Sequence, residues 1–182
     1  MNAIEIPLSK QKILLGIGVS LLFVVLGYYL FATIADQQNR LDPRLAKAMG
    51  ILGIIFFGGT GIFAIKKLFD KSLGLIISDQ GIFENTNALS IGFINWEDIT
   101  EIKTIQIKST KILLIFVKNP QLYLDKVSGF KKFLMKSNFS MYGTPLSITS
   151  VTVKIKFNEL EQIIMQRFEE YRKNTISDEV LN

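Results

Sequence analysis

The pattern of hydrophobic and polar positions divides the chain near residue 72. Before this point, two uncharged and mostly apolar stretches run from Ile13 to Ala35 and from Ala48 to Ile65. About 20 consecutive apolar residues are enough for a helix to cross a bilayer. The second stretch extends to residue 45 if the long side chain of Lys47 reaches the interface. We therefore predict a membrane hairpin over residues 1–71, with spans at about 13–35 and 45–65.

The first stretch has an alternative interpretation as a cleaved signal peptide. Lys10 and Lys12 would then form the basic region, and the sequence TIA, residues 33–35, would supply the cleavage site. However, the uncharged run is longer than the roughly 7–15 residues of a signal core, and a second apolar stretch follows at once. The pattern therefore favours a membrane span.

Lysine and arginine counts on the two sides of the predicted hairpin indicate its orientation. Five such residues flank its outer ends, and three lie in or beside the connecting loop. Because basic residues are enriched in cytoplasmic segments, this difference predicts both termini and the C-terminal domain in the cytoplasm. The flanking residues are Lys10, Lys12, Lys66, Lys67 and Lys71, and the loop residues are Arg40, Arg44 and Lys47.

Small residues recur at helical spacings within the two predicted spans and would let helix backbones approach closely. The sequence leaves open whether they serve the hairpin or self-association. The stretch GTGIFA, residues 59–64, matches a nucleotide-binding fingerprint, but that motif needs a preceding strand, so we interpret the match as chance. The small residues are Gly16, Ser20, Ala46, Gly50, Gly53, Thr60 and Ala64.

After residue 72 the pattern changes to short alternating runs separated by turns, which is typical of antiparallel strands. An inserted helix is expected over residues 121–137, where Leu122, Val127, Phe130, Phe133 and Leu134 share an approximate face. An amphipathic helix follows from about residue 158, and a disordered tail is expected over 173–182. Seven strands are predicted, at residues 73–78, 81–86, 88–96, 99–109, 111–119, 146–150 and 151–157.

About seven antiparallel strands, an inserted helix and a C-terminal amphipathic helix predict a pleckstrin-homology-like (PH-like) β-barrel over residues 72–182. The stretches IISDQGIFENT, INWEDITEI, LLIFVKNP and LMKSNFSMYGTPLSI resemble a family of small bacterial membrane proteins of unassigned function. Members of that family have two transmembrane helices before a PH-like domain. The resemblance covers roughly residues 4–170. It implies this fold and the bacterial inner membrane, and it implies no activity.

Composition narrows the chemistry that the chain could perform. The 182 residues include no cysteine and no histidine, which removes thiol nucleophiles, Cys/His metal sites and the usual proton-transfer group. The net charge is +5, and residues 1–71 carry most of it, with eight Lys/Arg against four Asp/Glu. A nucleic-acid surface would need cations clustered on the folded domain. We therefore expect no catalytic residues, cofactor, metal or nucleic-acid partner.

The sequence INWEDITEI, residues 94–102, contains the only tryptophan, directly followed by two carboxylates. On a strand, Glu97 and Asp98 would point to opposite faces and could not act on one bond. We therefore interpret this stretch as a structural corner, with Trp96 as a buried anchor. Contact with a partner or ligand is the alternative.

A cluster of lysines and aromatic residues in the inserted helix is the candidate binding site. One interpretation is a helix lying on the anionic cytoplasmic leaflet, with its apolar face down and its lysines at the headgroups. The other is an ordinary helix that covers the barrel with its lysines in water, and the sequence alone favours this second interpretation. The candidate residues are Lys126, Lys131, Lys132, Lys136, Phe130 and Phe133.

The function expected from these features is that of a non-enzymatic, membrane-anchored adaptor. Its cytoplasmic domain would bind a protein partner, anionic lipid headgroups, or both. The alternative is a structural scaffold that self-associates through the hairpin. An enzyme that uses only Asp, Glu, Lys and Tyr side chains is a further alternative.

Overall fold

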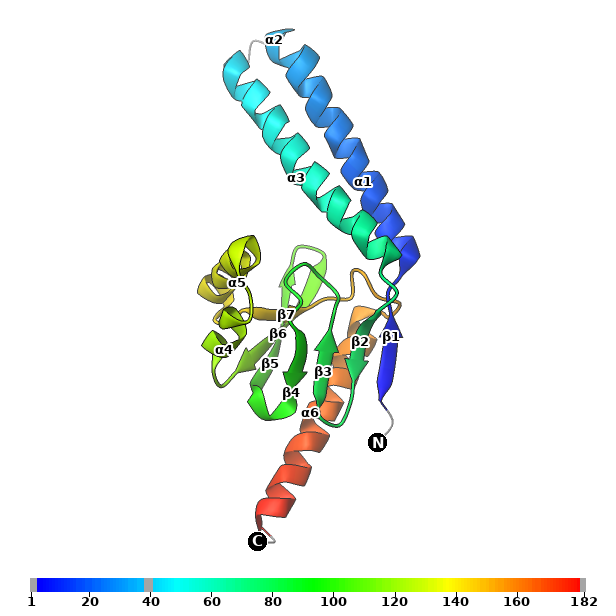
Figure 1. Cartoon of the computed structure of the whole chain (residues 1–182), viewed down its shortest axis with the longest axis vertical. Helices are drawn as coiled ribbons and strands as arrows, with labels where there is room; N and C mark the ends of the chain where they lie inside the picture. Colours follow the sequence, from blue (N-terminus) through cyan, green and yellow to red (C-terminus); the bar gives the residue numbers. More distant parts are fainter. Residues whose placement is uncertain (1–2, 38–40, 181–182) are drawn as a thin grey trace. The chain divides into compact units, whose positions relative to one another are not determined.

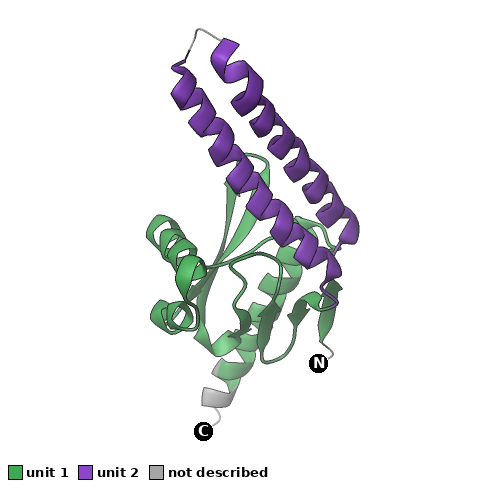
Figure 2. Ribbon diagram, turned by 45° about the horizontal axis from the view of Figure 1, so that its top comes forward, with its two compact units in different colours: residues 1–8, 72–182 green, residues 9–71 purple. Residues whose placement is uncertain are grey.

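A computed structural model describes residues 3–37 and 41–180, and it divides the chain into two compact units (Figure 2). Residues 9–71 form a helical unit, and the described residues 3–8 and 72–180 form a mixed unit that we call the soluble unit. The predicted boundary at residue 71 agrees with this division, but the assignment of residues 3–8 to the hairpin is wrong. These residues belong to the soluble unit because they supply one of its strands.

The helical unit consists of two long, apolar helical segments. The first comprises α1 (Lys10–Tyr29), a π-helical turn (Leu30–Ile34) and the short α2 (Ala35–Gln37), and the second is α3 (Pro43–Phe69) (Figure 1). Both segments are long and apolar enough to cross a membrane. They exceed the predicted spans at both ends, because capping groups and charged residues extend the helices beyond their uncharged stretches. Residues 38–40 of the predicted loop, including Arg40, lie outside the described residues.

The starts of both long helices have side-chain capping groups, which the sequence analysis did not single out. The Ser9 hydroxyl accepts a hydrogen bond from the backbone N–H of Lys12 at 3.4 Å. A carboxylate oxygen of Asp42 accepts one from the backbone N–H of Arg44 at 2.7 Å, with Pro43 at the first helical position. These contacts satisfy backbone donors that have no partner within the helix.

The two long helices pack through small and aromatic residues. A Cβ atom added to Gly50 would lie 2.7 Å from the carbonyl oxygen of Gly27, so only glycine permits this approach. The rings of Phe23 and Phe57 stack with their centroids 4.3 Å apart. Large apolar side chains such as Leu15 and Phe56 remain exposed on the outer surface. That surface suits a lipid environment better than the interior of a soluble protein.

The first sheet of the soluble unit contains four antiparallel strands in the order β1-β2-β3-β4. Its edge strand β1 was not predicted. Ile4 lies opposite Ile77 in the ladder, and Pro7 lies opposite Leu73. The segments that precede and follow the hairpin therefore form neighbouring strands. The strands are β1 (Ile4–Pro7), β2 (Leu73–Ile77), β3 (Gly81–Glu84) and β4 (Gly92–Asn95).

The second sheet contains three antiparallel strands: β5 (Ile99–Ile107), β6 (Thr110–Val117) and β7 (Leu146–Ile148). The two sheets are open, so the predicted closed barrel is wrong. The strand predicted at 151–157 is also wrong, because this segment is irregular and forms only an isolated bridge between Val153 and Leu8. The described residues therefore contain no final strand that could close the barrel.

The helices of the soluble unit differ from the prediction at their boundaries. The single helix expected over 121–137 is two helices, α4 (Pro120–Asp125) and α5 (Gly129–Tyr142). They separate at Gly129, whose φ of +58° lies in the left-handed region that favours glycine. The C-terminal helix α6 (Phe157–Val180) continues through most of the expected disordered tail, whose residues 181–182 are not described.

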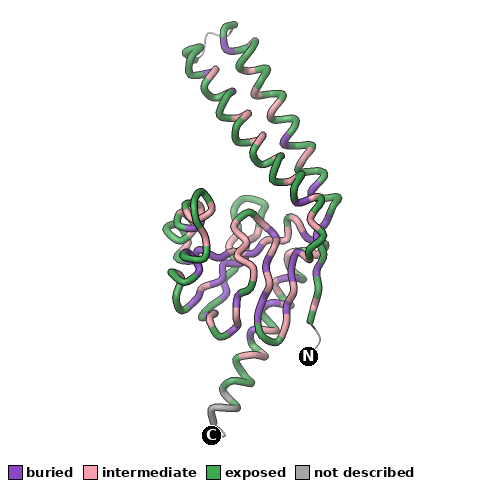
Figure 3. The backbone as a smooth tube through the Cα atoms, in the orientation of Figure 1, coloured by how far each residue is buried: buried purple, intermediate pink, exposed green. Residues whose placement is uncertain are grey.

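The core of the soluble unit lies between the sheets and α6 (Figure 3). Ile77 and Ile82 from the first sheet and Leu113 from the second are fully buried. Leu160 and Ile164 are also fully buried, and they form an apolar stripe on α6, the helix that was predicted to be amphipathic. Burial of an aliphatic side chain of this size contributes roughly 1.5–3 kcal/mol.

Candidate functional site

Trp96 forms a buried corner between the first sheet and α6. Its side chain is only 1% exposed, and its ring lies 6.0 Å from that of Phe168, measured between centroids. The indole N–H donates a hydrogen bond to the carbonyl oxygen of Ser78 at 2.9 Å. The predicted burial of Trp96 is confirmed.

The two carboxylates after Trp96 lie in a 3-10 turn (Trp96–Asp98). The expectation that they lie on a strand and point to its opposite faces is therefore wrong. Asp98 accepts hydrogen bonds from the Tyr123 hydroxyl at 2.8 Å and from the Asn95 amide at 3.4 Å. Burial, and next this contact with Asp98, raise the pKa of Tyr123 well above its ordinary value. Glu97 is exposed. Asp98 therefore fixes the position of α4 relative to the turn.

A pocket of about 290 Å³ lies beside this corner, next to the second half of α6. Arg167 lies within it, and its guanidinium is 3.8 Å from carboxylate oxygens of both Asp79 and Glu170. Its positive charge is therefore compensated by the protein itself. Within the described ranges, no three acidic side chains are grouped so that they could hold a metal ion. The pocket is lined by Ser78, Asp79, Trp96, Arg167, Glu170, Tyr171 and Asn174.

The predicted lysine and aromatic cluster lies on α5 and directly after α4, in a region that we call the α4–α5 surface. Local sequence signals determine where α4 begins and where α5 ends. Asn119 caps α4 by accepting the backbone N–H of Gln121 at 3.2 Å, and Gly143 ends α5 with a φ of +76°. The surface is made of Leu122, Lys126, Phe130, Lys132, Phe133, Lys136 and Met141.

Large apolar side chains of the α4–α5 surface face outward. Phe130 is 74% exposed and Phe133 is 62% exposed, and their rings stack with centroids 6.2 Å apart. The expectation that Phe130 and Phe133 lie on the apolar face of one helix over residues 121–137 is therefore wrong. The core is filled from these helices by Tyr123, Leu124 and Met135 instead.

The lysines of the cluster have different environments. The ammonium of Lys126 lies 4.6 Å from the centroid of the Tyr123 ring. The ammonium of Lys132 lies 2.9 Å from a carboxylate oxygen of Asp125, and this hydrogen bond lowers the pKa of that carboxyl group. Lys136 is exposed. Of the three, Lys136 is thus an exposed lysine on the same helix as the aromatic pair.

Lys131 does not belong to the α4–α5 surface, although the sequence placed it with the other lysines. Its ammonium donates a hydrogen bond to the carbonyl oxygen of Ser90, in the loop between β3 and β4. Lys131 therefore attaches α5 to the first sheet.

The sequence did not identify Leu122 and Met141 as members of this surface. They are 57% and 67% exposed. Leu122 shared the expected apolar face, which suggested burial. The glycine at 129 was the available signal that the two helices have different orientations.

The arrangement suits contact with a partner that is both apolar and anionic. Residues 120–142 contain four lysines and one aspartate, so the segment has a net positive charge. Aromatic rings that project between lysines are typical of segments that lie at a membrane interface. Comparison of the chain with family models, with curated proteins and with solved structures finds no match.

Proposed function

We propose that this chain is a membrane-anchored, non-enzymatic interaction protein whose soluble unit binds anionic lipid headgroups through the α4–α5 surface. We also propose the bacterial inner membrane as its location, with the soluble unit in the cytoplasm. The lysine and arginine counts around the hairpin support this orientation. The antiparallel sheets and C-terminal helix support a distant, open variant of the PH-like fold.

The observation that carries the proposal is the exposure of the stacked pair Phe130 and Phe133. A helix that simply covers a sheet would turn two such rings toward the core and leave its lysines in water. Here the rings and Lys136 all project outward. Exposed aromatic side chains next to lysines match the polarity of an interface between acyl chains and anionic headgroups.

The expected strength of this binding is modest. A lysine near an anionic leaflet contributes about 1 kcal/mol. The surface presents Lys126, Lys132 and Lys136, of which Lys132 is already paired with Asp125. Electrostatics alone would therefore give weak binding, and burial of the two aromatic rings would add to it. Weak binding is sufficient for a domain that is already tethered to a membrane, because the tether raises the effective concentration.

The test uses the full-length chain held in nanodiscs of zwitterionic lipid, so that only the soluble unit is free to contact added vesicles. Vesicles of phosphatidylcholine, with or without phosphatidylglycerol, are added and separated by flotation. The unmodified chain is expected to float with the anionic vesicles only. The double variant K132E/K136E is expected to lose at least about 2 kcal/mol of binding free energy, or roughly thirtyfold in affinity.

The matched control is R172E/K173E, which reverses two exposed charges on α6 and leaves the α4–α5 surface unchanged. It is expected to retain most of the binding. Equal loss in both double variants would mean that net charge, and not this surface, determines binding. Absence of flotation with anionic vesicles would contradict the proposed function.

A further inference from the structure

The chain leaves the soluble unit at two adjacent points. Pro7 lies near the end of β1, and opposite it in the ladder is Leu73, the first residue of β2. The chain continues from Leu8 into the first long helix, and it returns from the second long helix into Leu73. Both connections to the hairpin therefore leave from the same end of the first sheet, which we call the exit end.

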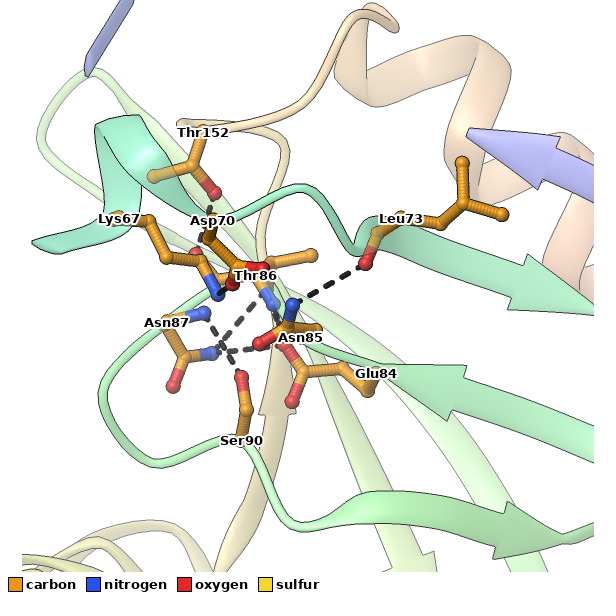
Figure 4. A network of polar contacts seen from close by, with 9 residues as sticks. All are labelled: Lys67, Asp70, Leu73, Glu84, Asn85, Thr86, Asn87, Ser90 and Thr152. Carbon is orange, nitrogen blue, oxygen red and sulfur yellow. Dashed lines mark hydrogen bonds and ion pairs between the residues drawn. The ribbon is translucent and has the colours of Figure 1, made fainter. Parts of the chain in front are cut away.

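The loop of residues 85–91 also lies at the exit end (Figure 4). It follows Glu84, which pairs with Leu75 near the start of β2. The backbone N–H of Asn85 donates to the carbonyl oxygen of Gly74 at 2.8 Å, and its side-chain amide donates to that of Leu73 at 3.3 Å. Hydrogen bonds thus hold this loop against the residues where the chain enters the sheet.

The start of α5 is attached to the same loop. The Lys131 ammonium donates to the carbonyl oxygen of Ser90, and Lys131 is adjacent in sequence to Phe130. The Asn87 side-chain amide donates to the carbonyl oxygen of Ser147 at 3.1 Å, which joins the loop to β7. The aromatic pair is therefore attached through this loop to the exit end.

The two connections between the units are short. Ser9 alone separates Leu8 from α1, and residues 70–72 separate α3 from β2. Three extended residues span at most about 10 Å. The headgroup layer on each side of a bilayer is roughly 5–8 Å thick. If both long helices span a bilayer, two connections of this length keep the exit end close to its headgroups.

From these relationships we infer that the α4–α5 surface docks on the bilayer that holds the chain's own hairpin, with Phe130 and Phe133 at the boundary between headgroups and acyl chains. This inference rests on the proposed function and names the membrane that the surface contacts. Of the two lysines between the phenylalanines, Lys131 fixes α5 to the exit end, whereas Lys132, together with Lys136, contacts the headgroups. The docked soluble unit then has one preferred orientation on the membrane.

A fluorescent label can test this docking at a single position, because the chain has no cysteine that would react elsewhere. Ser128→Cys places the label beside Phe130, and Lys173→Cys places it on the second half of α6 as the matched control; both positions are exposed. The full-length chain is held in nanodiscs that contain phosphatidylglycerol. Lipids with a nitroxide near the headgroup report contact by quenching the label.

Quenching several-fold stronger at position 128 than at position 173 is the expected result. Adding F130S/F133S to the Ser128→Cys chain should reduce that quenching to the level of position 173. The exposed rings can be replaced without loss of core packing, which the emission of Trp96 verifies. Equal quenching at the two positions would overturn the inference.

The two proposals can fail separately. If nanodisc-held chain floats with added anionic vesicles while the label at position 128 stays in water, the proposed function stands and docking on the chain's own bilayer is wrong. If flotation fails, lipid binding by this surface is wrong, and the inference that rests on it is wrong too.

Discussion

Pro7 and Leu73 lie opposite each other in one sheet, although the whole helical hairpin separates them in the sequence. If both long helices span the bilayer, this pairing requires both flanks of the hairpin to lie on the same side. It also means that the soluble unit is not a contiguous segment. A fragment that begins at residue 72 would lack β1 and would expose the edge of β2, which is an aggregation hazard.

Ile6 should be important for stability even though it precedes the first long helix. Its side chain is 4% exposed, and it pairs with Leu75. We expect Ile6→Ala to lower the free energy of unfolding of the soluble unit by about 2–5 kcal/mol, because it removes buried methyl groups and leaves a cavity. Urea unfolding of the full chain, followed through the fluorescence of Trp96, measures this change.

The neighbouring Glu5 provides the control for Ile6, because it lies on the same strand and is exposed. Glu5→Ala should change the free energy of unfolding by no more than about 0.5 kcal/mol. Equal effects of the two substitutions would show that β1 contributes little buried contact.

Tyr123 should make stability depend on pH in the alkaline range. Its folded-state pKa is raised, so the fold favours the protonated hydroxyl. This contribution is fully present below the ordinary tyrosine pKa of about 10, and it is lost as the pH rises above that value. The free energy of unfolding should therefore fall above about pH 10.

Tyr123→Phe tests this dependence. The variant should flatten the alkaline decline, and at neutral pH it should cost about 1–3 kcal/mol, because Asp98 loses a hydrogen-bond donor. Tyr171→Phe on α6 removes a tyrosine hydroxyl elsewhere and serves as the control. An alkaline decline of the same size in the Tyr123→Phe chain would contradict the assignment.

Gly50 should determine how closely the two long helices pack. Gly50→Ala places a methyl group against the backbone of Gly27, which should cost about 1–3 kcal/mol or force the helices apart. A disulfide between introduced cysteines at Ser20 and Thr60, whose hydroxyl oxygens are 3.4 Å apart, reports the separation through its yield. Gly53→Ala is the control, since a Cβ there meets open space. Similar yields in both variants would contradict the contact.

Trp96 should be sensitive even to a conservative substitution. Trp96→Phe keeps an aromatic ring beside Phe168 but removes the hydrogen bond to the carbonyl oxygen of Ser78. We expect a loss of about 1–3 kcal/mol, measured by circular dichroism during thermal unfolding. Glu97→Gln, at the exposed neighbouring position, should unfold like the unmodified chain. An unchanged unfolding temperature for Trp96→Phe would show that the corner does not depend on this bond.

Features encoded by local periodicity could be predicted from the sequence. The two long apolar helices, six of the seven predicted strands and the buried stripe of α6 all follow from spacing within one segment. The strand β1 could not be predicted in this way, because IEIP is four residues long and its partner lies beyond the hairpin. Conversely, residues 151–157 alternate like a strand, but alternation does not supply a partner, and only Val153 forms a bridge.

The candidate site, too, could be predicted only as far as it depends on local sequence. The lysines and phenylalanines of α5 could be found from composition, but not the direction in which Phe130 and Phe133 point. Periodicity shows that residues share a face, whereas the rest of the fold determines which face is buried. The break at Gly129 lets α4 contribute Tyr123 and Leu124 to the core, and α5 contributes Met135, which leaves the phenylalanines outside.

The pairing of β1 with β2 also imposes an order on biosynthesis. Residues 4–7 leave the ribosome first, and their partner strand follows only after both long helices have been made. At about 5–20 residues per second, this interval lasts roughly 3–13 s. If only one of the two long helices crossed the bilayer, β1 and β2 would lie on opposite sides of the membrane, and the sheet could not form. If the hairpin spans a bilayer, completion of the soluble unit therefore requires that both long helices have been inserted together.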